Sequence, residues 1–232
     1  MTLKKLIYLA LFICISIKMQ SQQIPFSKPD YDLIKKNIAN KSSSFYYQKL
    51  QQRLAALDTL LTKDEYRHLY FGYAFQKKYN ANWISPVQKE LEVFYKQPKI
   101  DAQDHDKIIK LLDKSIIDFP FDLQSYNFLY YIVAQSGDND EAMKISKITQ
   151  GLFSAILSSG DGKTCETGFH VLVVAHEYAL LNMFELRATA QSLVGNCDYL
   201  SFEKGKYKIE GLFFDIRKMR ENQKFNLEKK FK

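Results

Sequence analysis

After its first 18 residues the sequence lacks any long apolar run. A helix that spans a bilayer needs about 20 consecutive apolar residues, so we expect no membrane-spanning segment beyond this point. The one apolar run, Leu6–Ile17, follows Lys4 and Lys5 and is too short to cross a bilayer. A basic start with a short apolar stretch is typical of a cleaved signal peptide. We therefore predict a signal peptide over residues 1–21 and an exported protein, periplasmic or secreted.

The body of the chain also lacks an excess of one charge. The formal net charge is +7, of which residues 1–21 contribute +3 and residues 217–232 contribute +5, leaving −1 for the body. A nucleic-acid site needs a concentrated basic face, so we exclude nucleic acid as a partner. We interpret residues 217–232 as a basic tail with a solvated, frayed end. The alternative is a tail that contacts an anionic membrane surface or a partner.

Cysteine is scarce, and Cys14 of the three lies in the predicted signal peptide. In an oxidising compartment the remaining Cys165 and Cys197 can pair, and such a disulfide contributes about 3 to 4 kcal/mol. The alternative is a nucleophilic thiol beside a histidine, for which His170 and His176 are the nearest in sequence. The sequence alone leaves these alternatives open.

Complete catalytic motifs are missing. No serine lies in a Gly-x-Ser-x-Gly elbow. Gly162-Lys163-Thr164 ends like a phosphate-binding loop, but Leu157 occupies the position of its first glycine. We therefore interpret the segment around Asp161 as a glycine-containing loop, and we expect no cofactor.

The pair His176-Glu177 matches the first half of a zinc-protease helix, in which a second histidine follows four residues after the first. Leu180 occupies that position, so we expect no metal site. His170 would project from the same side as His176 if the segment were one continuous strand. His176, Glu177 and His170 remain the catalytic candidates, against the alternative of hydrogen-bonded structural side chains.

Thr62, followed three residues later by Glu65, forms a capping box, which predicts a helix over Lys63–Tyr79. Its aromatic stripe includes Tyr70 and Tyr73. These rings have two interpretations. They line a ligand groove and stack on a sugar or an apolar peptide, or they are ordinary helical core. Tyr70, Tyr73 and Asp161 are therefore the candidate ligand-binding residues. Apolar periodicity and start signals predict further helices over Asp30–Ile38, Phe45–Leu57, Pro86–Tyr95, Asp104–Phe119, Asp122–Gln135 and Asn139–Leu157.

The last two predicted helices resemble a tetratricopeptide helix pair. Pro120 precedes them, Gly137 lies in the tight connection, and Ala142 follows five residues later. One repeat length before Ala142 is Ile108, which suggests an earlier, partial repeat. Tetratricopeptide-like antiparallel pairs are therefore expected.

The pattern changes after Gly160. Phe169–Ala175 is rich in β-branched residues, and Tyr199–Phe202 and Tyr207–Phe214 flank a turn. We predict an α+β fold, mostly helical, with a small, mostly antiparallel sheet at the C-terminal end. The expected single domain covers residues 22–216, helical over 30–158 and β-rich over 159–216.

An ordered set of motifs resembles the domain of unknown function 4919 family: Asp30-Tyr31, Tyr46-Tyr47, Leu61-Thr62, Glu65-Tyr66, Leu69–Tyr73, Ser159–Gly162, His176–Tyr178 and Gly211–Phe214. The resemblance covers nearly the whole mature chain. It implies an exported bacterial protein with one domain. Because it carries no known activity, it transfers no catalytic residue. Cys165 stands where such proteins are expected to have proline, which implies no disulfide or thiol role common to the family.

The leading functional hypothesis is a non-enzymatic, exported protein-binding or peptide-binding module, or a scaffold, whose partner is another envelope protein or a peptide. The repeat-like helices and the incomplete catalytic motifs favour it. The alternative is a cell-envelope hydrolase that acts on peptide or glycan through His176, Glu177 and His170. A purely structural role in a stable oligomer is a third hypothesis, and the sequence does not fix the oligomeric state.

Overall fold

The structure is a computed structural model that describes residues 26–230. The predicted signal peptide lies outside these residues. The helices are α2 (Tyr31–Ala39), α3 (Tyr47–Ala55), α4 (Lys63–Gly72), η1 (Tyr73–Phe75), α5 (Gln88–Tyr95), η2 (Ala102–Asp104), α6 (His105–Asp118), α7 (Leu123–Gln135), α8 (Asn139–Leu157), α9 (Val174–Met183) and α10 (Arg217–Lys230). The strands are β1 (Phe169–His170), β2 (Ala188–Val194), β3 (Cys197–Phe202) and β4 (Gly211–Asp215). The α+β, mostly helical fold is therefore confirmed.

Several helices begin directly after a polar residue that caps their N-terminus. Asp30, Asp122 and Asp138 each accept a hydrogen bond from a backbone N–H in the first turn of the helix that follows. The capping box of Thr62 and Glu65 is confirmed at the start of α4. The helix expected over Lys63–Tyr79 is shorter than predicted, because it tightens into η1 after Gly72 and becomes extended at Gln76.

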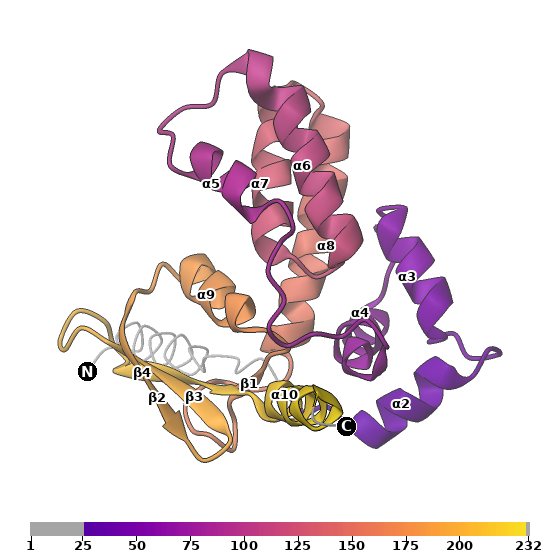
Figure 1. The fold of residues 1–232 in the computed structure, drawn as a ribbon, viewed down its shortest axis with the longest axis vertical. Coiled ribbons are helices and arrows are strands. Elements are labelled where there is room, and N and C mark those ends of the chain that lie inside the picture. The colour runs from indigo at the N-terminus through magenta and orange to yellow at the C-terminus, as the bar shows by residue number, and fades with distance from the viewer. Residues whose placement is uncertain (1–25, 231–232) are drawn as a thin grey trace, which may run out of the picture.

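Helices α6, α7 and α8 stand together as one bundle, with α2 to α4 on one side and the sheet below it (Figure 1). The connection between α7 and α8 turns at Gly137, whose φ of +89° favours glycine. This helix hairpin agrees with the sequence analysis. The tetratricopeptide-like repeat itself stays a prediction.

The sheet has the strand order β1-β4-β3-β2. β3 pairs with both β4 and β2 in antiparallel fashion, and the two-residue β1 pairs with β4 in parallel. The expected antiparallel pairing of β3 with β4 is thus confirmed, and one parallel pair is added. The strand expected over Tyr207–Phe214 is wrong before Gly211, because residues 203–210 form the connection.

The expected strand over Phe169–Ala175 is wrong beyond His170. Val171, Leu172 and Val173 are buried, but α9 begins at Val174. A short apolar run fits a buried strand and a buried helix start equally well by periodicity, and here the chain turns into a helix. The same-side projection of His170 and His176 from one strand is therefore also wrong.

The C-terminal segment is a helix, so the interpretation of a frayed tail from residue 217 is wrong. Met219 of α10 is buried, and the Asn222 side chain accepts from the Ala81 N–H and donates to the Tyr79 carbonyl. These contacts hold α10 against the loop that follows η1.

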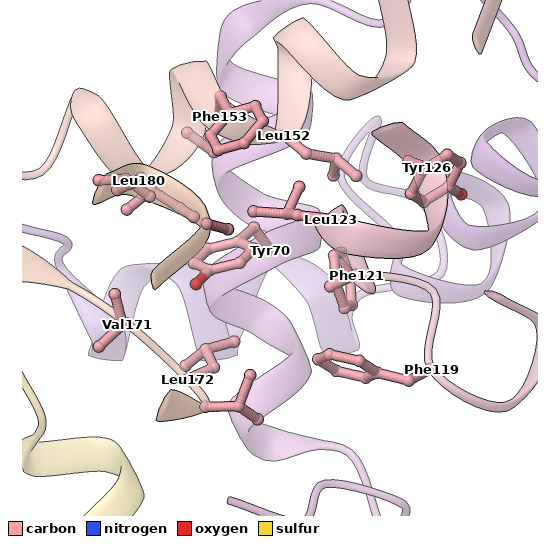
Figure 2. Close-up of a cluster of buried hydrophobic side chains, with 14 of the residues drawn as sticks. Tyr70, Phe119, Phe121, Leu123, Tyr126, Leu152, Phe153, Val171, Leu172 and Leu180 are labelled. Carbon is pink, nitrogen blue, oxygen red and sulfur yellow. The ribbon is translucent and has the colours of Figure 1, made fainter. Parts of the chain in front are cut away.

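The core lies where α4, α7, α8 and α9 meet, as the buried side chains in Figure 2 show. Tyr70 of α4 lies among Phe121 and Leu123 at the start of α7 and Leu180 of α9. Gly151 lets α8 approach α4, because a Cβ atom there would lie 2.2 Å from Cζ of Tyr66. Together these contacts pack α4 against α8, α9 and the start of α7.

Candidate functional site

His176 lies in the first turn of α9 and is buried between two fixed partners. Its Nε2 lies 2.9 Å from the Phe121 carbonyl oxygen, and its Nδ1 lies 2.6 Å from the Tyr70 hydroxyl. A carbonyl only accepts, so Nε2–H donates to it and Nδ1 accepts from the Tyr70 O–H. Burial lowers the pKa of His176 to about 4. The ring is therefore a neutral bridge between α4, α9 and the start of α7.

Glu177, the residue that follows His176, is fully buried. Neither carboxyl oxygen has a hydrogen-bond partner among the described residues. Burial, followed by the negative charge of Asp198 on β3, raises the pKa of Glu177 to about 9. The side chain is therefore protonated at neutral pH. It offers no carboxylate to a solvent-borne substrate.

His170 is buried on β1 with different partners. Its Nδ1 lies 3.4 Å from the Tyr31 hydroxyl, and its Nε2 lies 3.7 Å from Oδ2 of Asp215, which also pairs with Arg217. Burial lowers the pKa of His170 to about 4, although Asp215 opposes the shift. The structure therefore places the three catalytic candidates in closed surroundings, without the shared cleft that a hydrolase needs.

The loop around Asp161 closes on itself. The N–H groups of Asp161 and Gly162 both donate to the Thr167 carbonyl, at 2.8 and 2.9 Å. The Asp161 carboxylate pairs with Lys163 at 3.1 Å. These backbone donors are already used, so the loop does not present the row of free N–H groups that a phosphate requires.

The other candidates are structural in this fold. Tyr70 and Tyr73 are buried, so the interpretation as core replaces that of a ligand groove. Cys165 and Cys197 form a disulfide, which ties the loop before β1 to β3. Among residues 26–230, no group of three His, Cys, Asp or Glu side chains is placed to hold a metal ion. In the same range, no helix is long and apolar enough to cross a bilayer.

Strand β2 is the exposed edge of the sheet, opposite the edge formed by β1. Its sequence, Ala-Thr-Ala-Gln-Ser-Leu-Val, has no charged residue, and all of its residues except Ala188 are exposed. Leu193 is 59% and Val194 is 44% exposed. Most natural edge strands carry lysine, proline or a cover that blocks further pairing. Among residues 26–230, β2 has only a register irregularity between Ala188 and Ala190.

A groove of about 470 Å³ lies between α5, α7 and α9. Three aromatic and three amide side chains line it: Tyr95, Phe128, Tyr178, Gln124, Asn127 and Asn182. On α7 and on α9 these residues follow helical spacings of three or four, so each helix contributes one face. Two alanines of α9, Ala175 and Ala179, complete the lining, which has no charged residue.

A family model described as a domain of unknown function, DUF4919, matches residues 32–224. The chain belongs to the DUF4919 family. No curated protein and no solved structure matches it. The family description assigns no activity, so the function of this DUF4919 protein has to be argued from its own geometry.

Both exposed features of the DUF4919 chain lack a strong signal in the sequence. β2 has two β-branched residues and no aromatic one, and its alternation of apolar and polar residues stops at Gln191, although Gly195-Asn196 is a two-residue hairpin signal that could have revealed the strand. The groove has no signal in the sequence, because its α9 wall, including Tyr178 and Asn182, starts in a segment whose β-branched residues indicate a strand.

Proposed function

We propose that this DUF4919 protein is an exported, non-catalytic binding module that pairs an extended segment of a partner protein with strand β2. The observation that carries the proposal is a seven-residue, uncharged and exposed edge strand. An exposed edge binds a peptide strand through main-chain hydrogen bonds, and side-chain positions along it add specificity.

The hairpin register determines which backbone groups are free. Gly195 and Asn196 form a two-residue turn, which makes Val194 and Cys197 the closing pair. Backbone groups alternate along an antiparallel strand. Ser192 and Val194 therefore bond to β3, whereas Gln191 and Leu193 direct their N–H and C=O groups away from the sheet. A partner segment can use these outward groups without disturbing the fold.

One way for two copies of the chain to pair at this edge brings like charges together. If two β2 strands paired in register and antiparallel about Gln191, the exposed Arg187 of one copy would lie opposite Gly195 of the other. The Gly195 carbonyl already accepts from Arg220 at 2.9 Å. Two arginines would then be brought together, and like charges placed opposite each other destabilise a strand pair.

The alternative function, an envelope hydrolase, receives no support from the site geometry. His176 and Glu177 are enclosed, and His170 lies in another cluster. The proposed export depends on residues 1–21 and stays part of the proposal.

The test uses a displayed library of random peptides of about 12 residues, selected on the full mature chain. Leu193→Pro removes an outward N–H without removing a bond to β3, because proline is tolerated at the free side of an edge strand. Leu193→Val is the matched control, because it keeps the donor. Selected peptides are expected to bind Leu193→Pro about tenfold more weakly and to bind Leu193→Val like wild type.

Thermal unfolding of both variants checks that the fold is kept. The proposal is wrong if the library yields no binder. It is also wrong if binders tolerate Leu193→Pro, or if sedimentation shows a dimer that Leu193→Pro disrupts.

A further inference from the structure

The groove between α5, α7 and α9 is separate from β2 and combines two kinds of surface. Tyr95 and Phe128 have ring centroids 4.9 Å apart, and Tyr131 lies almost parallel to Phe128 at 6.1 Å. Tyr178 faces the groove from α9 and is 44% exposed. Tyr95 and Phe128 are partly buried against the core, whereas Tyr178 is exposed. The accessible parts of these rings form an apolar surface on which a flat ligand face can stack.

Amide side chains supply the polar part of the groove. Gln124 and Asn127 come from α7, and Asn182 comes from α9, so donors and acceptors stand on both walls. All three residues are exposed. An amide offers two N–H donors and one carbonyl acceptor, which lets each of these side chains bond to a hydroxyl that both donates and accepts.

The absence of charge narrows the ligand class. None of the lining residues is acidic or basic, so a phosphate, a carboxylate or an ammonium group would lose water without gaining an opposite charge. A purely apolar ligand would leave the three amides without polar partners. The fitting ligand is neutral, has several hydroxyl groups and also has an apolar face.

We propose that this groove is a binding site for a short, neutral oligosaccharide. The sugar ring stacks on Tyr178 and Phe128, and its hydroxyls bond to the amides of Gln124, Asn127 and Asn182. The volume of about 470 Å³ lies within the usual range of small-ligand sites. This activity is additional to partner binding at β2.

The experiment is a screen of neutral oligosaccharides on an array, followed by titration calorimetry with the best binder. Cellobiose, maltose and chitobiose are the first soluble probes, and a digalacturonate is the charged comparison. Tyr178→Ala removes one stacking ring. Tyr130→Ala is the matched control, because Tyr130 is 45% exposed on α7 but does not line the groove.

A neutral sugar is expected to bind, with the digalacturonate much weaker. Tyr178→Ala is expected to raise the Kd about tenfold or more, and Tyr130→Ala is expected to leave it unchanged. Failure of every neutral sugar to bind overturns the proposal, as does binding that Tyr178→Ala leaves intact.

The two proposals fail separately. Leu193→Pro should weaken peptide binding and leave sugar binding intact, whereas Tyr178→Ala should do the reverse. If selected peptides bind the wild type and lose affinity in Tyr178→Ala, the groove takes peptide and the saccharide assignment is wrong.

Discussion

Replacing Glu177 by glutamine should stabilise the protein at neutral pH relative to acidic pH. The carboxyl of Glu177 is buried without a hydrogen-bond partner, and its pKa is raised from 4.5 to about 9. Glutamine has nearly the same shape and no proton to lose. The change in its effect with pH therefore isolates the cost of keeping this acid protonated, because the cost of burying the amide itself does not depend on pH.

The sign and the size of the effect follow from linkage. Above pH 4.5 the unfolded chain releases the Glu177 proton, whereas the folded chain keeps it until the pH approaches about 9. Folding stability is therefore lost as the pH rises between these values. Between the unfolded pKa of 4.5 and pH 7 lie about 2.5 pH units, and each unit lowers the free energy of unfolding by about 1.4 kcal/mol. At pH 7 the protein has therefore lost about 3 kcal/mol of stability. This figure depends little on the folded pKa, as long as that pKa stays above 7.

Urea unfolding of wild type and Glu177→Gln at pH 4 and pH 7, with the disulfide intact, measures the effect. The stability of Glu177→Gln relative to wild type should be about 3 kcal/mol greater at pH 7 than at pH 4. Glu210→Gln, which changes an exposed glutamate, is the control and should show no such difference. A stability difference between the two proteins that is the same at both pH values would refute the buried neutral carboxyl.

Two further predictions concern contacts within the core. Gly151→Ala should destabilise the fold by about 1 to 3 kcal/mol, because its Cβ would meet the Tyr66 ring, even though alanine normally favours a helix. Chemical unfolding measures this loss, and most of it should be absent when Gly151→Ala is made in a Tyr66→Leu background. Tyr70→Phe should cost about 1 to 3 kcal/mol because it leaves Nδ1 of His176 without its donor, and a chemical unfolding midpoint equal to wild type would contradict the assigned bond.

The helical half was predictable because its signals are local. A capping residue marks where a helix begins, as Thr62 does for α4, and a proline marks where a helix stops, as Pro120 does for α6. The length of α4 was overestimated, since the aromatic stripe continues through Tyr73 while the backbone tightens after Gly72. Local patterns therefore fixed the start of α4 better than its end.

The C-terminal half depends on contacts that local patterns do not contain. Val171 to Val173 are buried by tertiary packing, and only the bond from the Val171 N–H to Asp215 pairs this segment with the sheet. The burial of His176 and Glu177 follows from packing of α9 on the core, so a motif that suggested chemistry proved to be enclosed. The position of β2 as an edge strand is a property of sheet order, which the sequence of β2 does not show.

Amide hydrogen exchange across β2, with and without a selected peptide, tests the central claim most directly. Ser192 and Val194 bond to β3 and should exchange slowly in both states. Gln191 and Leu193 face outward and should be slowed only when the peptide is bound. Unchanged exchange at Gln191 and Leu193 with the peptide bound would contradict pairing at this edge.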